Sequence, residues 1–412
     1  RPLPSLTEGV VSLALIDPDD APLAVFEISG GSTGDGFAAL ADGRAEIVLA
    51  DRDLTMAERA LLLERGLGDL SAPERRRLVA RRELSLFAGS AAEKVPSLPA
   101  AQLPAVLSGD ITSWAALGGE DVPINPGVLA EKTGALEARV AGLTGLGEPF
   151  ALSVKELASE GEAESFLNGD PGALVVAQSA LPLGQRIGLS GACNRGIVDV
   201  LDEAADPLRL DLWAYTAAPR LSDIARAFLV FATGPDAQRV VDRAGFLDKR
   251  PRPVPLGAQG IRVAQAVLSV ETAGDLEALQ SALSRLSGLE RLSVTFRFEE
   301  GDAPILTGLS ESEARILASL IDSGAFDGQS LLFAGFVNSA VDGEIGRRLS
   351  EAQARVALEA VQAATLTRFD RVEMLAQGMG ALFPLACDDT GWASQVNRRV
   401  EVWLGPGPVP ID

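Results

Sequence analysis

The sequence has no histidine, only two cysteines and a single tyrosine in 412 residues. Without histidine, the chain has no Ser-His-Asp triad, no Cys-His nucleophile pair, no imidazole acid-base group and no histidine-ligated metal site. Cys193 and Cys387 are too far apart in the sequence for a zinc knuckle or a Cys-x-x-Cys redox pair. They are two free thiols or, in an oxidising compartment, one disulfide between distant segments. We therefore expect no cofactor and no metal, and most hydrolase mechanisms are excluded.

Positive charge is also scarce, since 36 Lys and Arg residues face 57 Asp and Glu residues and give a net charge of -21. Such a chain repels phosphate backbones and anionic lipid, and it has no cluster of basic residues with interleaved aromatic residues. We therefore expect no nucleic-acid partner. A small anion can still bind, because hydrogen bonds from a few backbone amides and one basic side chain outweigh a screened long-range field.

Long apolar runs are missing as well. The run from Val10 to Ile16 ends at Asp17, well short of the roughly 18 to 20 residues that cross a bilayer. Residues 1–8 show no apolar core of an export signal, so such a signal was removed or was never part of this sequence. The sequence predicts no transmembrane segment.

The pattern of the chain predicts two or three compact units. Residues 249–257 hold three prolines and a glycine without an apolar period, which indicates a stiff boundary segment. Before this boundary, strand-like and helix-like segments alternate, which is typical of α/β layers. We expect a hairpin, a short helix and a buried strand at residues 11–16 with 23–28, 32–42 and 45–49.

Helix-start signals and apolar periods predict the remaining elements. Two capping boxes, Thr55-x-x-Glu58 and Ser310-x-x-Glu313, predict helix starts, and Ser222 can cap a further helix. After the boundary, residues 264–286 have a helical pattern, and a βαβαβ order follows. The strands expected in that order are residues 294–298, 331–336 and 371–375, and a last strand is expected at 399–404.

Three ordered motifs of the tail carry a family resemblance. They are Gly335-Phe-Val-Asn338, Arg347-Arg-Leu-Ser-Glu-Ala-Gln-Ala354 and Asn397-Arg-Arg-Val-Glu401. In order and spacing they resemble the signatures of the OmpA-like module. This resemblance implies a periplasmic protein that attaches to peptidoglycan, with an aspartate and an arginine gripping the two charged ends of the peptide's diaminopimelate.

The aligned positions of this chain differ from that pattern. Asn338 and Gln353 stand where the module has its aspartate and arginine, and Gly346 replaces an asparagine. Amides can form hydrogen bonds but supply no charge complementarity, so peptidoglycan binding stays open. Asn397 and Arg398 are the remaining positions that the resemblance assigns to the module, and they also fit the start of an edge strand.

The front part resembles the phosphate-type substrate-binding proteins of ABC uptake systems. The resemblance rests on Leu107-Ser-Gly-Asp-Ile-Thr-Ser-Trp114, continuing to Gly119, and on weaker pieces at residues 36–50, 170–174 and 228–246. It implies two α/β lobes with a ligand between them, although the family's first strand and first phosphate loop are missing from this sequence. Trp114 itself is expected to be a packing residue.

The same resemblance implies an oxyanion site built from backbone amides at helix starts, hydroxyl groups and an arginine. By position, Ser29, Gly31 and Ser32 form one helix-start loop, with Arg52 as the basic partner. Lys132 and Thr133 stand near the place of the family's second loop. Ser29 and Ser32 fit ordinary turn and N-cap chemistry equally well.

The predicted fold class is therefore α/β, with a two-lobed periplasmic-binding-protein-like domain, N-terminally incomplete, and a small α+β domain of βαβαβ order resembling the OmpA-like module. The predicted domains are residues 1–250 (lobe 1 about 1–85 and 205–250, lobe 2 about 86–204), a Pro-rich linker and connecting helix at 251–290, and the OmpA-like domain at 291–412.

Three functional hypotheses follow. The first is a non-enzymatic periplasmic receptor for phosphate or another small oxyanion, associated with the cell wall or outer membrane through its tail. The second is a structural envelope protein whose ligand cleft has degenerated and which acts through contacts with other envelope proteins. The third is an enzyme that uses paired carboxylates such as Asp19-Asp20, Glu299-Glu300 or Asp388-Asp389, which as neighbours on a loop usually diverge into solvent.

Overall fold

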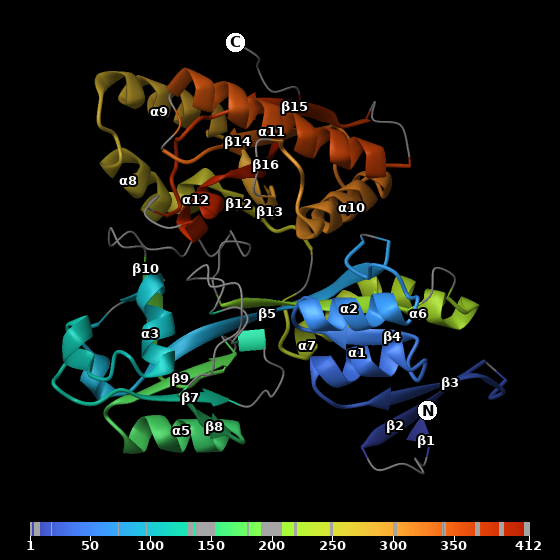
Figure 1. The fold of residues 1–412 in the computed structure, drawn as a ribbon. Helices are drawn as coiled ribbons and strands as arrows, with labels where there is room; N and C mark the ends of the chain where they lie inside the picture. The colour runs from blue at the N-terminus through green and yellow to red at the C-terminus, as the bar shows by residue number, and fades with distance from the viewer. Residues whose placement is uncertain are drawn as a thin grey trace. The chain divides into compact units, whose positions relative to one another are not determined.

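The computed structural model describes residues 2–3, 9–17, 19–72, 74–95, 97–129, 135–136, 140, 153–178, 181–190, 208–217, 221–247, 250–299, 303–339, 341, 343–366, 371–386 and 391–407. The chain divides into two compact units. Figure 1 shows their helices and strands, coloured along the chain. Unit 1 comprises Arg1–Ala80, Lys132–Ala135 and Asp211–Val241, and unit 2 comprises the remainder. Cys193, Cys387, Lys132 and Thr133 lie outside the described residues.

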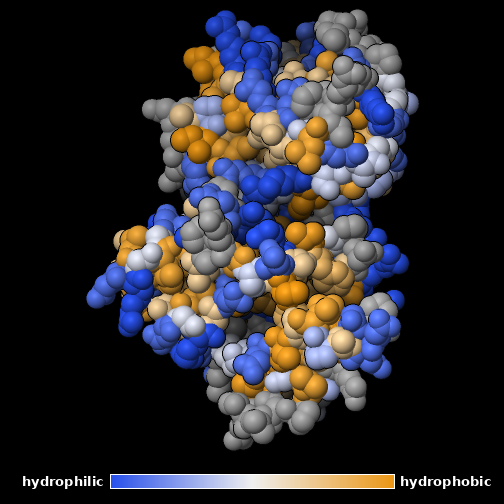
Figure 2. Space-filling model, turned by 90° about the vertical axis from the view of Figure 1, so that its right-hand side faces the viewer, coloured by the Kyte–Doolittle hydropathy of each residue, from blue (hydrophilic) through white to orange (hydrophobic). Residues whose placement is uncertain are grey.

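Unit 1 begins with a three-stranded antiparallel sheet in the order β1-β2-β3, formed by Pro2–Leu3, Val10–Ile16 and Pro22–Ser29. The predicted hairpin is confirmed. Its turn is held by the Asp17 carboxylate, which accepts hydrogen bonds from the N–H groups of Asp19 at 2.9 Å and Ala21 at 2.8 Å. Large apolar side chains remain exposed on this sheet, including Val11 and Val25. Figure 2 shows hydrophobic surface gathered over the lower part of that view.

Helices and one strand pair complete unit 1. Helix α1 (Thr33–Ala41) leads to β4 (Ile47–Ala50), which pairs antiparallel with β11 (Arg209–Thr216). The other helices are α2 (Met56–Glu64), α6 (Asp223–Thr233) and α7 (Pro235–Arg243). Phe37 and Leu40 of α1 are fully buried, and the helix lies so close to β4 that a Cβ on Gly36 would come within 2.6 Å of Val48 Cγ1. The predicted helix at residues 32–42 and the cap at Ser222 are confirmed.

The front part of unit 2 is built around β5 (Arg76–Ala88), whose first residues belong to unit 1. Its second half pairs antiparallel with β9 (Ala173–Gln178), which continues in parallel to β7 (Asn125–Leu129) and β8 (Lys155–Leu157). The smaller elements are η1 (Ser90–Ala92), β6 (Ser97–Pro99), η2 (Ala100–Gln102), α3 (Leu103–Ser108), η3 (Trp114–Leu117), α5 (Glu160–Gly169) and β10 (Gln185–Ser190).

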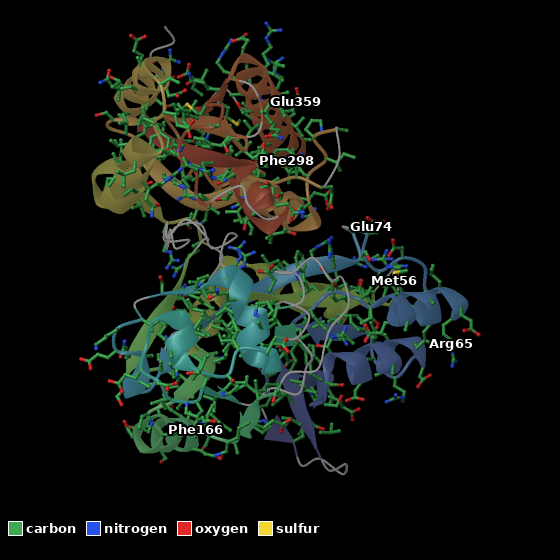
Figure 3. The ribbon with its side chains drawn as sticks, turned by 60° about the vertical axis from the view of Figure 1, so that its left-hand side comes forward. Met56, Arg65, Glu74, Phe166, Phe298 and Glu359 are labelled. Atoms are coloured by element: carbon green, nitrogen blue, oxygen red, sulfur yellow. The ribbon has the colours of Figure 1, made fainter. Side chains whose placement is uncertain are left out.

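Trp114 is a packing residue of this region, as predicted. Its side chain is fully buried in the main cluster of apolar residues, and its Nε1 donates a hydrogen bond to the Gly172 carbonyl oxygen at 3.0 Å. Phe166, labelled on α5 in Figure 3, carries the Lys155 ammonium over its ring at 4.8 Å.

The C-terminal part of unit 2, residues 250–407, contains a five-stranded sheet in the order β12-β13-β16-β14-β15. Only β14 and β15 pair in parallel. In chain order the elements are β12 (Pro253–Pro255), η4 (Leu256–Gln259), α8 (Gly260–Leu268), α9 (Ala273–Leu286), β13 (Glu290–Arg297), α10 (Gly308–Asp322), β14 (Gln329–Phe336), α11 (Gly343–Ala364), β15 (Glu373–Gly378), α12 (Gly391–Asn397) and β16 (Arg399–Pro406).

Helices cover both faces of this sheet. Leu331 and Phe333 of β14 point to one face and pack with α10 and α11, whereas Leu332 and Ala334 point to the other and pack with α8 and α9. The predicted βαβαβ order is present, and the predicted fold class, α/β with an α+β C-terminal part, is confirmed.

Three expected elements differ from the structure. Residues 253–255, expected in a boundary segment, form the edge strand β12 beside β13. The helix expected at 264–286 is two helices, because Thr272 caps α9 and ends the continuity. The capping box at Ser310 is wrong. Helix α10 starts at Gly308 with Thr307 as its N-cap, and Ser310 is buried, with its Oγ bonded to the backbone of Arg297.

Candidate functional site

The start of α1 is the first part of the candidate site in unit 1. Ser32 caps the helix, since its Oγ accepts a hydrogen bond from the Asp35 N–H at 3.1 Å. The Asp35 carboxylate in turn accepts from the Ser32 N–H at 3.0 Å and from its Oγ at 2.7 Å. These bonds hold the pKa of Asp35 below its usual value. The predicted ligand hydroxyl of Ser32 is thus engaged by the helix that it caps.

Two backbone amides at this helix start remain open. The N–H groups of Thr33 and Gly34 form no hydrogen bond within the described part of the chain. Both belong to the first turn, where N–H groups lack an intrahelical acceptor and carry the positive end of the helix dipole. These two N–H groups are therefore donors at the start of α1 that have no acceptor among the described residues.

Arg52 lies beside these amides. A Cβ placed on Gly34 would lie 3.7 Å from Arg52 Nη2 and 3.7 Å from Ser32 Oγ, so the predicted arginine and the predicted helix start do meet. Both Nη atoms of Arg52 donate to the Glu58 carboxylate at 2.8 Å, and Nη1 also donates to the Asp53 carbonyl oxygen at 3.0 Å. The guanidinium fork therefore already holds a carboxylate.

The pair formed by Arg52 and Glu58 is largely covered, with 14% and 15% of the side chains exposed. Hydrogen bonding to Glu58 raises the pKa of Arg52. Burial acts to raise the pKa of Glu58, but hydrogen bonds from Arg52 and Thr55 outweigh it and hold this pKa below its usual value. Thr55 and Glu58 also form the predicted capping box of α2, which is confirmed.

Further acidic groups border the same region. Thr33 Oγ1 donates to the Asp51 carboxylate at 2.7 Å. Asp53 accepts hydrogen bonds from Tyr215 at 2.9 Å and Arg76 at 2.9 Å. Burial and the charge of Asp53 raise the pKa of Tyr215, which keeps the phenol neutral. Sequence reasoning found Arg52 but missed these carboxylates, because nothing in the local pattern shows which acid folds onto it.

Two other described residues, Ser29 and Gly31, were also predicted to contact the ligand. Ser29 ends β3 and is exposed, and Gly31 lies against the Asp35 side chain. Among the described candidates, the structure brings Ser32 and Arg52 together around Gly34.

The tail positions Asn338 and Gln353 lie in the C-terminal part. Asn338 follows β14, and Gln353 lies on α11 with 1% of its surface exposed. The Oδ1 of Asn338 and the Oε1 of Gln353 are buried and have no hydrogen-bond partner among the described residues. A buried amide oxygen that lacks a hydrogen-bond donor is energetically costly.

Asn397 has a structural role. Its Oδ1 accepts from the N–H groups of Leu385 at 2.8 Å and Ala386 at 3.1 Å, and its Nδ2 donates to the Ala386 carbonyl oxygen at 2.7 Å. Arg398 is half-buried and directly precedes β16, which is the central strand of the sheet, so the alternative of an edge-strand start is wrong. Asn397 therefore fastens the loop before α12, and its amide is not available to a ligand.

The motif from Asn397 to Glu401 also contributes residues to a buried ionic cluster. Glu401 is fully buried, and its carboxylate contacts Arg262 at 2.5 Å, Arg399 at 2.7 Å and Arg291 at 3.5 Å. Trp403 Nε1 donates to it at 3.2 Å. Burial acts to raise the pKa of Glu401, but the three arginines reverse this and hold it far below its usual value. Since Arg262 belongs to α8, the cluster fastens this helix to the sheet.

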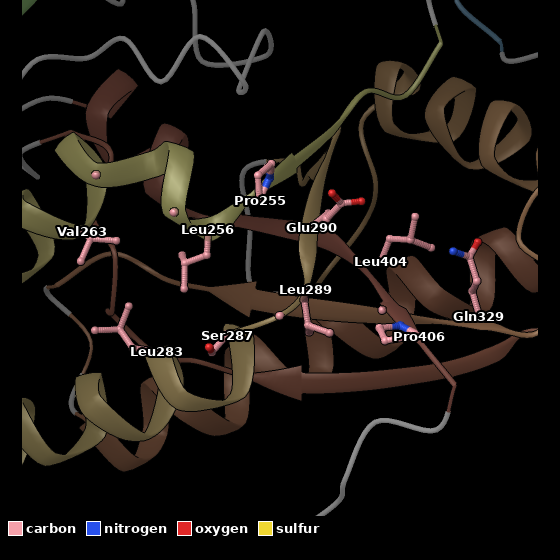
Figure 4. A pocket seen from close by; sticks show the side chains of 14 residues that line it. Pro255, Leu256, Val263, Leu283, Ser287, Leu289, Glu290, Gln329, Leu404 and Pro406 are labelled. Atoms are coloured by element: carbon pink, nitrogen blue, oxygen red, sulfur yellow. The ribbon is translucent and has the colours of Figure 1, made fainter.

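The C-terminal part also contains an open cavity of about 690 Å³. Figure 4 shows apolar side chains around it, including Leu256 and Val263 on one side and Leu289 and Leu404 on another. None of the predicted site residues lines this cavity. Among the described residues, no group of three or more Cys, Asp or Glu could hold a metal ion, and no helix is long and apolar enough to cross a membrane.

Comparison with known proteins assigns residues 4–236 to a family. Residues 4–236 match the family described as a PBP superfamily domain, and the chain belongs to this superfamily. No curated protein matches the chain. The fold is similar to an ABC-type phosphate transport receptor from Vibrio cholerae, at 18% identity and a TM-score of 0.44, over 53% of this chain and 86% of that chain.

Two further solved structures are similar to parts of the chain. A putative phosphate ABC transporter substrate-binding protein with bound phosphate from Clostridium perfringens has 18% identity and a TM-score of 0.39, over 53% of this chain and 85% of that chain. The peptidoglycan-associated lipoprotein from Burkholderia pseudomallei has 16% identity and a TM-score of 0.23, over 26% of this chain and 88% of that chain.

Proposed function

We propose that this protein is a non-enzymatic periplasmic receptor that binds phosphate or another small oxyanion at the start of α1. Its C-terminal part acts as an OmpA-like module that associates it with the cell envelope. Membership of the PBP superfamily supports the receptor role. The observation that carries the ligand class is the open N–H groups of Thr33 and Gly34 beside the Arg52 guanidinium.

The ion pair between Arg52 and Glu58 should determine how strongly this site binds an anion. An oxyanion at the open amides has to share Arg52 with a carboxylate that already holds both Nη atoms at 2.8 Å. Because like charges repel and unlike charges attract, we expect Glu58 to weaken anion binding and Arg52 to strengthen it. Removing the charge of Glu58 should therefore improve binding.

Thermal unfolding in the presence of phosphate or sulfate tests the proposal. A ligand that binds only the folded state stabilises it, by about 2.7 kcal/mol when its concentration is a hundred times Kd. We expect Glu58→Gln to show the larger stabilisation by phosphate, wild type a smaller one and Arg52→Gln none. Arg226→Gln is the matched control, because Arg226 lies in the same unit with 63% of its side chain exposed. If neither wild type nor Glu58→Gln responds at about 10 mM anion, the receptor role fails.

A second candidate function is a structural envelope protein whose ligand site has degenerated. The occupied fork of Arg52 and the capping bonds between Ser32 and Asp35 favour it, because the chain's own carboxylates fill positions that an anion would use. Binding to purified cell-wall sacculi addresses the tail in both cases. If only the double variant Asn338→Asp with Gln353→Arg pellets with sacculi, the wild-type module has lost its cell-wall grip, and envelope association must come from other proteins.

A further inference from the structure

Strand β15 forms one edge of the C-terminal sheet. Within the described part of the chain it pairs only with β14. All six of its residues are half-buried, whereas all but the first residue of β14 are buried. Figure 1 shows β15 beside α11, in agreement with the contacts between the two elements.

The direction of the backbone groups on β15 follows from one hydrogen bond. The Met379 N–H donates to the Gly335 carbonyl oxygen at 2.8 Å, next to the registered pair Gly335 and Gly378. Backbone groups alternate in direction along a strand, so the N–H and C=O of Gln377 also point to β14. Those of Ala376 point the opposite way, to the outer edge.

A groove runs along this outer edge. A cavity of about 510 Å³ is lined by residues 375–379 from β15 and its end, by Ala278 and Ser281 of α9, and by Arg347 of α11. The two helices pack on opposite faces of the sheet, so the edge lies between them. Three of the four side chains that α9 offers here, Ala278, Ser281 and Ala282, are small, and the fourth is Arg285. A chain in extended conformation has the backbone groups to pair with this edge.

The opposite edge of the sheet is protected. Strand β12 carries Pro253 and Pro255, which have no N–H to offer to a further strand. Strand β15 has neither proline nor lysine in its sequence Glu-Met-Leu-Ala-Gln-Gly. Within the described ranges, the prolines of β12 therefore block one edge, and no further strand covers the edge at β15.

Charge around the groove favours an acidic occupant. Arg285 of α9 and Arg347 of α11 both line it, from opposite faces of the sheet, together with a single acid, Glu351. Arg347 keeps 54% of its side chain exposed while contacting Glu344 at 3.2 Å and Glu351 at 3.9 Å. In a chain of net charge -21, two arginines at one groove select for a negatively charged partner.

We propose that the outer edge of β15 binds an extended acidic segment of another protein, which adds a strand to the sheet between α9 and α11. The backbone groups of Ala376 pair with the segment, and Arg285 and Arg347 contact its carboxylates. This site is separate in sequence from the oxyanion site and does not depend on it.

Fluorescence anisotropy of a labelled peptide tests the proposal with the full chain. The probe is the hexapeptide Glu-Val-Glu-Val-Glu-Val, compared with Lys-Val-Lys-Val-Lys-Val and with a copy of the acidic peptide whose backbone nitrogens are all methylated. We expect the acidic peptide alone to bind. Ala376→Pro, which removes an outward N–H, and Arg285→Glu should each weaken binding by about tenfold or more.

Arg355→Glu is the matched control, because Arg355 lies on α11 with 63% of its side chain exposed and does not line the groove. It should bind like wild type. Hydrogen exchange gives a readout that does not need a variant. In the free protein the Ala376 amide should exchange faster than those of Gln377 and Met379, and the acidic peptide should slow it.

Three results would overturn the proposal. One is no binding of the acidic peptide at about 1 mM. Another is equal binding by wild type, Ala376→Pro and Arg285→Glu. The third is protection of the Ala376 amide without peptide that rises with protein concentration together with dimers in sedimentation, because the edge would then pair with a second copy of this chain.

Discussion

A fully buried carboxylate stays ionised only where cations replace the water that it has lost. Glu401 meets this condition through three arginines, two of them fully buried and the third, Arg262, 6% exposed. Replacing it with glutamine would leave these cations without their common counter-charge. We expect Glu401→Gln to lower the free energy of unfolding by about 3 to 5 kcal/mol in urea titrations.

Glu351→Gln is the control for this prediction. Glu351 has 39% of its side chain exposed and forms only surface pairs with Arg347 and Arg355. Its replacement should change stability by less than about 0.5 kcal/mol. Similar losses in both variants would contradict the role assigned to the buried cluster.

Glu58 predicts a pH dependence of stability. Its pKa in the folded protein is lowered from the ordinary value of 4.5. A carboxyl group with a lowered folded pKa stabilises the protein above the unfolded pKa, and this contribution is lost as the pH falls through the folded pKa. The advantage of wild type over Glu58→Gln in thermal unfolding should therefore be present at neutral pH and shrink below about pH 4.5.

Glutamine is a suitable replacement here because it can keep the capping box with Thr55. The comparison then isolates the charge that Arg52 contacts. A difference in melting temperature that stays constant from neutral pH to pH 3 would show that the Glu58 charge does not contribute as described.

For single residues, the sequence predicted the chemistry of a side chain well, but it did not predict which other side chain would contact it. Arg52 was predicted as an anion contact from its position, and the structure places it at the start of α1. Its occupation by Glu58 could not be predicted, because Glu58 already had a complete local explanation as a capping residue. Gln353 and Asn338 were found by motif, but their burial without partners depends on packing between α11 and β14.

Elements with strong local signals were predicted well. The hairpin of β2 and β3, helix α1 and the alternating strand β13 follow from turn chemistry, a cap and a period of two. Ser310 shows the limit of such signals. Its Ser-x-x-Glu spacing matches a capping box, yet Thr307 caps the helix one turn earlier and Ser310 binds the backbone of β13 instead.

Because α11 lies close to β15, we expect one added methyl group at Gly378 to destabilise the fold strongly. A Cβ on Gly378 would come within 2.1 Å of the Arg347 carbonyl oxygen and 2.7 Å of the Glu351 nitrogen. Because both atoms belong to the helix backbone, α11 has to move away from the sheet. We expect Gly378→Ala to cost about 3 kcal/mol or more in urea unfolding.

Gly343→Ala is the control within the same helix. A Cβ at Gly343 would meet nothing within 4 Å, and alanine stabilises helices relative to glycine. Its free energy of unfolding should be unchanged or higher by up to about 1 kcal/mol. A neutral Gly378→Ala variant would mean that α11 does not pack this closely.

At the scale of the molecule, we propose that the C-terminal domain begins at β12, near residue 250, earlier than the start at residue 291 expected from the motifs. Helices α8 and α9 bury one whole face of the sheet, including Leu332, Phe336 and Trp403. The family motifs lie after residue 334, so the helical pattern at residues 264–286 was interpreted as a connecting helix and not as part of this cover.

Two fragments test this boundary. Residues 250–412 should unfold cooperatively in circular dichroism, because they contain both apolar clusters of the sheet and the complete Glu401 cluster. Residues 291–412 lack Arg262 and the cover of α8 and α9, and they should aggregate or unfold at a lower temperature. Equal stability of the two fragments would place the boundary at residue 291.

The way in which β12 and α8 are fastened has a mechanical consequence. If the chain from residue 250 to Arg262 were an irregular coil, it would lengthen under tension and would not transmit the force. Here the first residues after position 250 are held by the ladder to β13, and Arg262 is tied to Glu401 within the sheet. A pull arriving along the chain before residue 250 would therefore meet a firm attachment, and the load would pass directly into the five-stranded sheet.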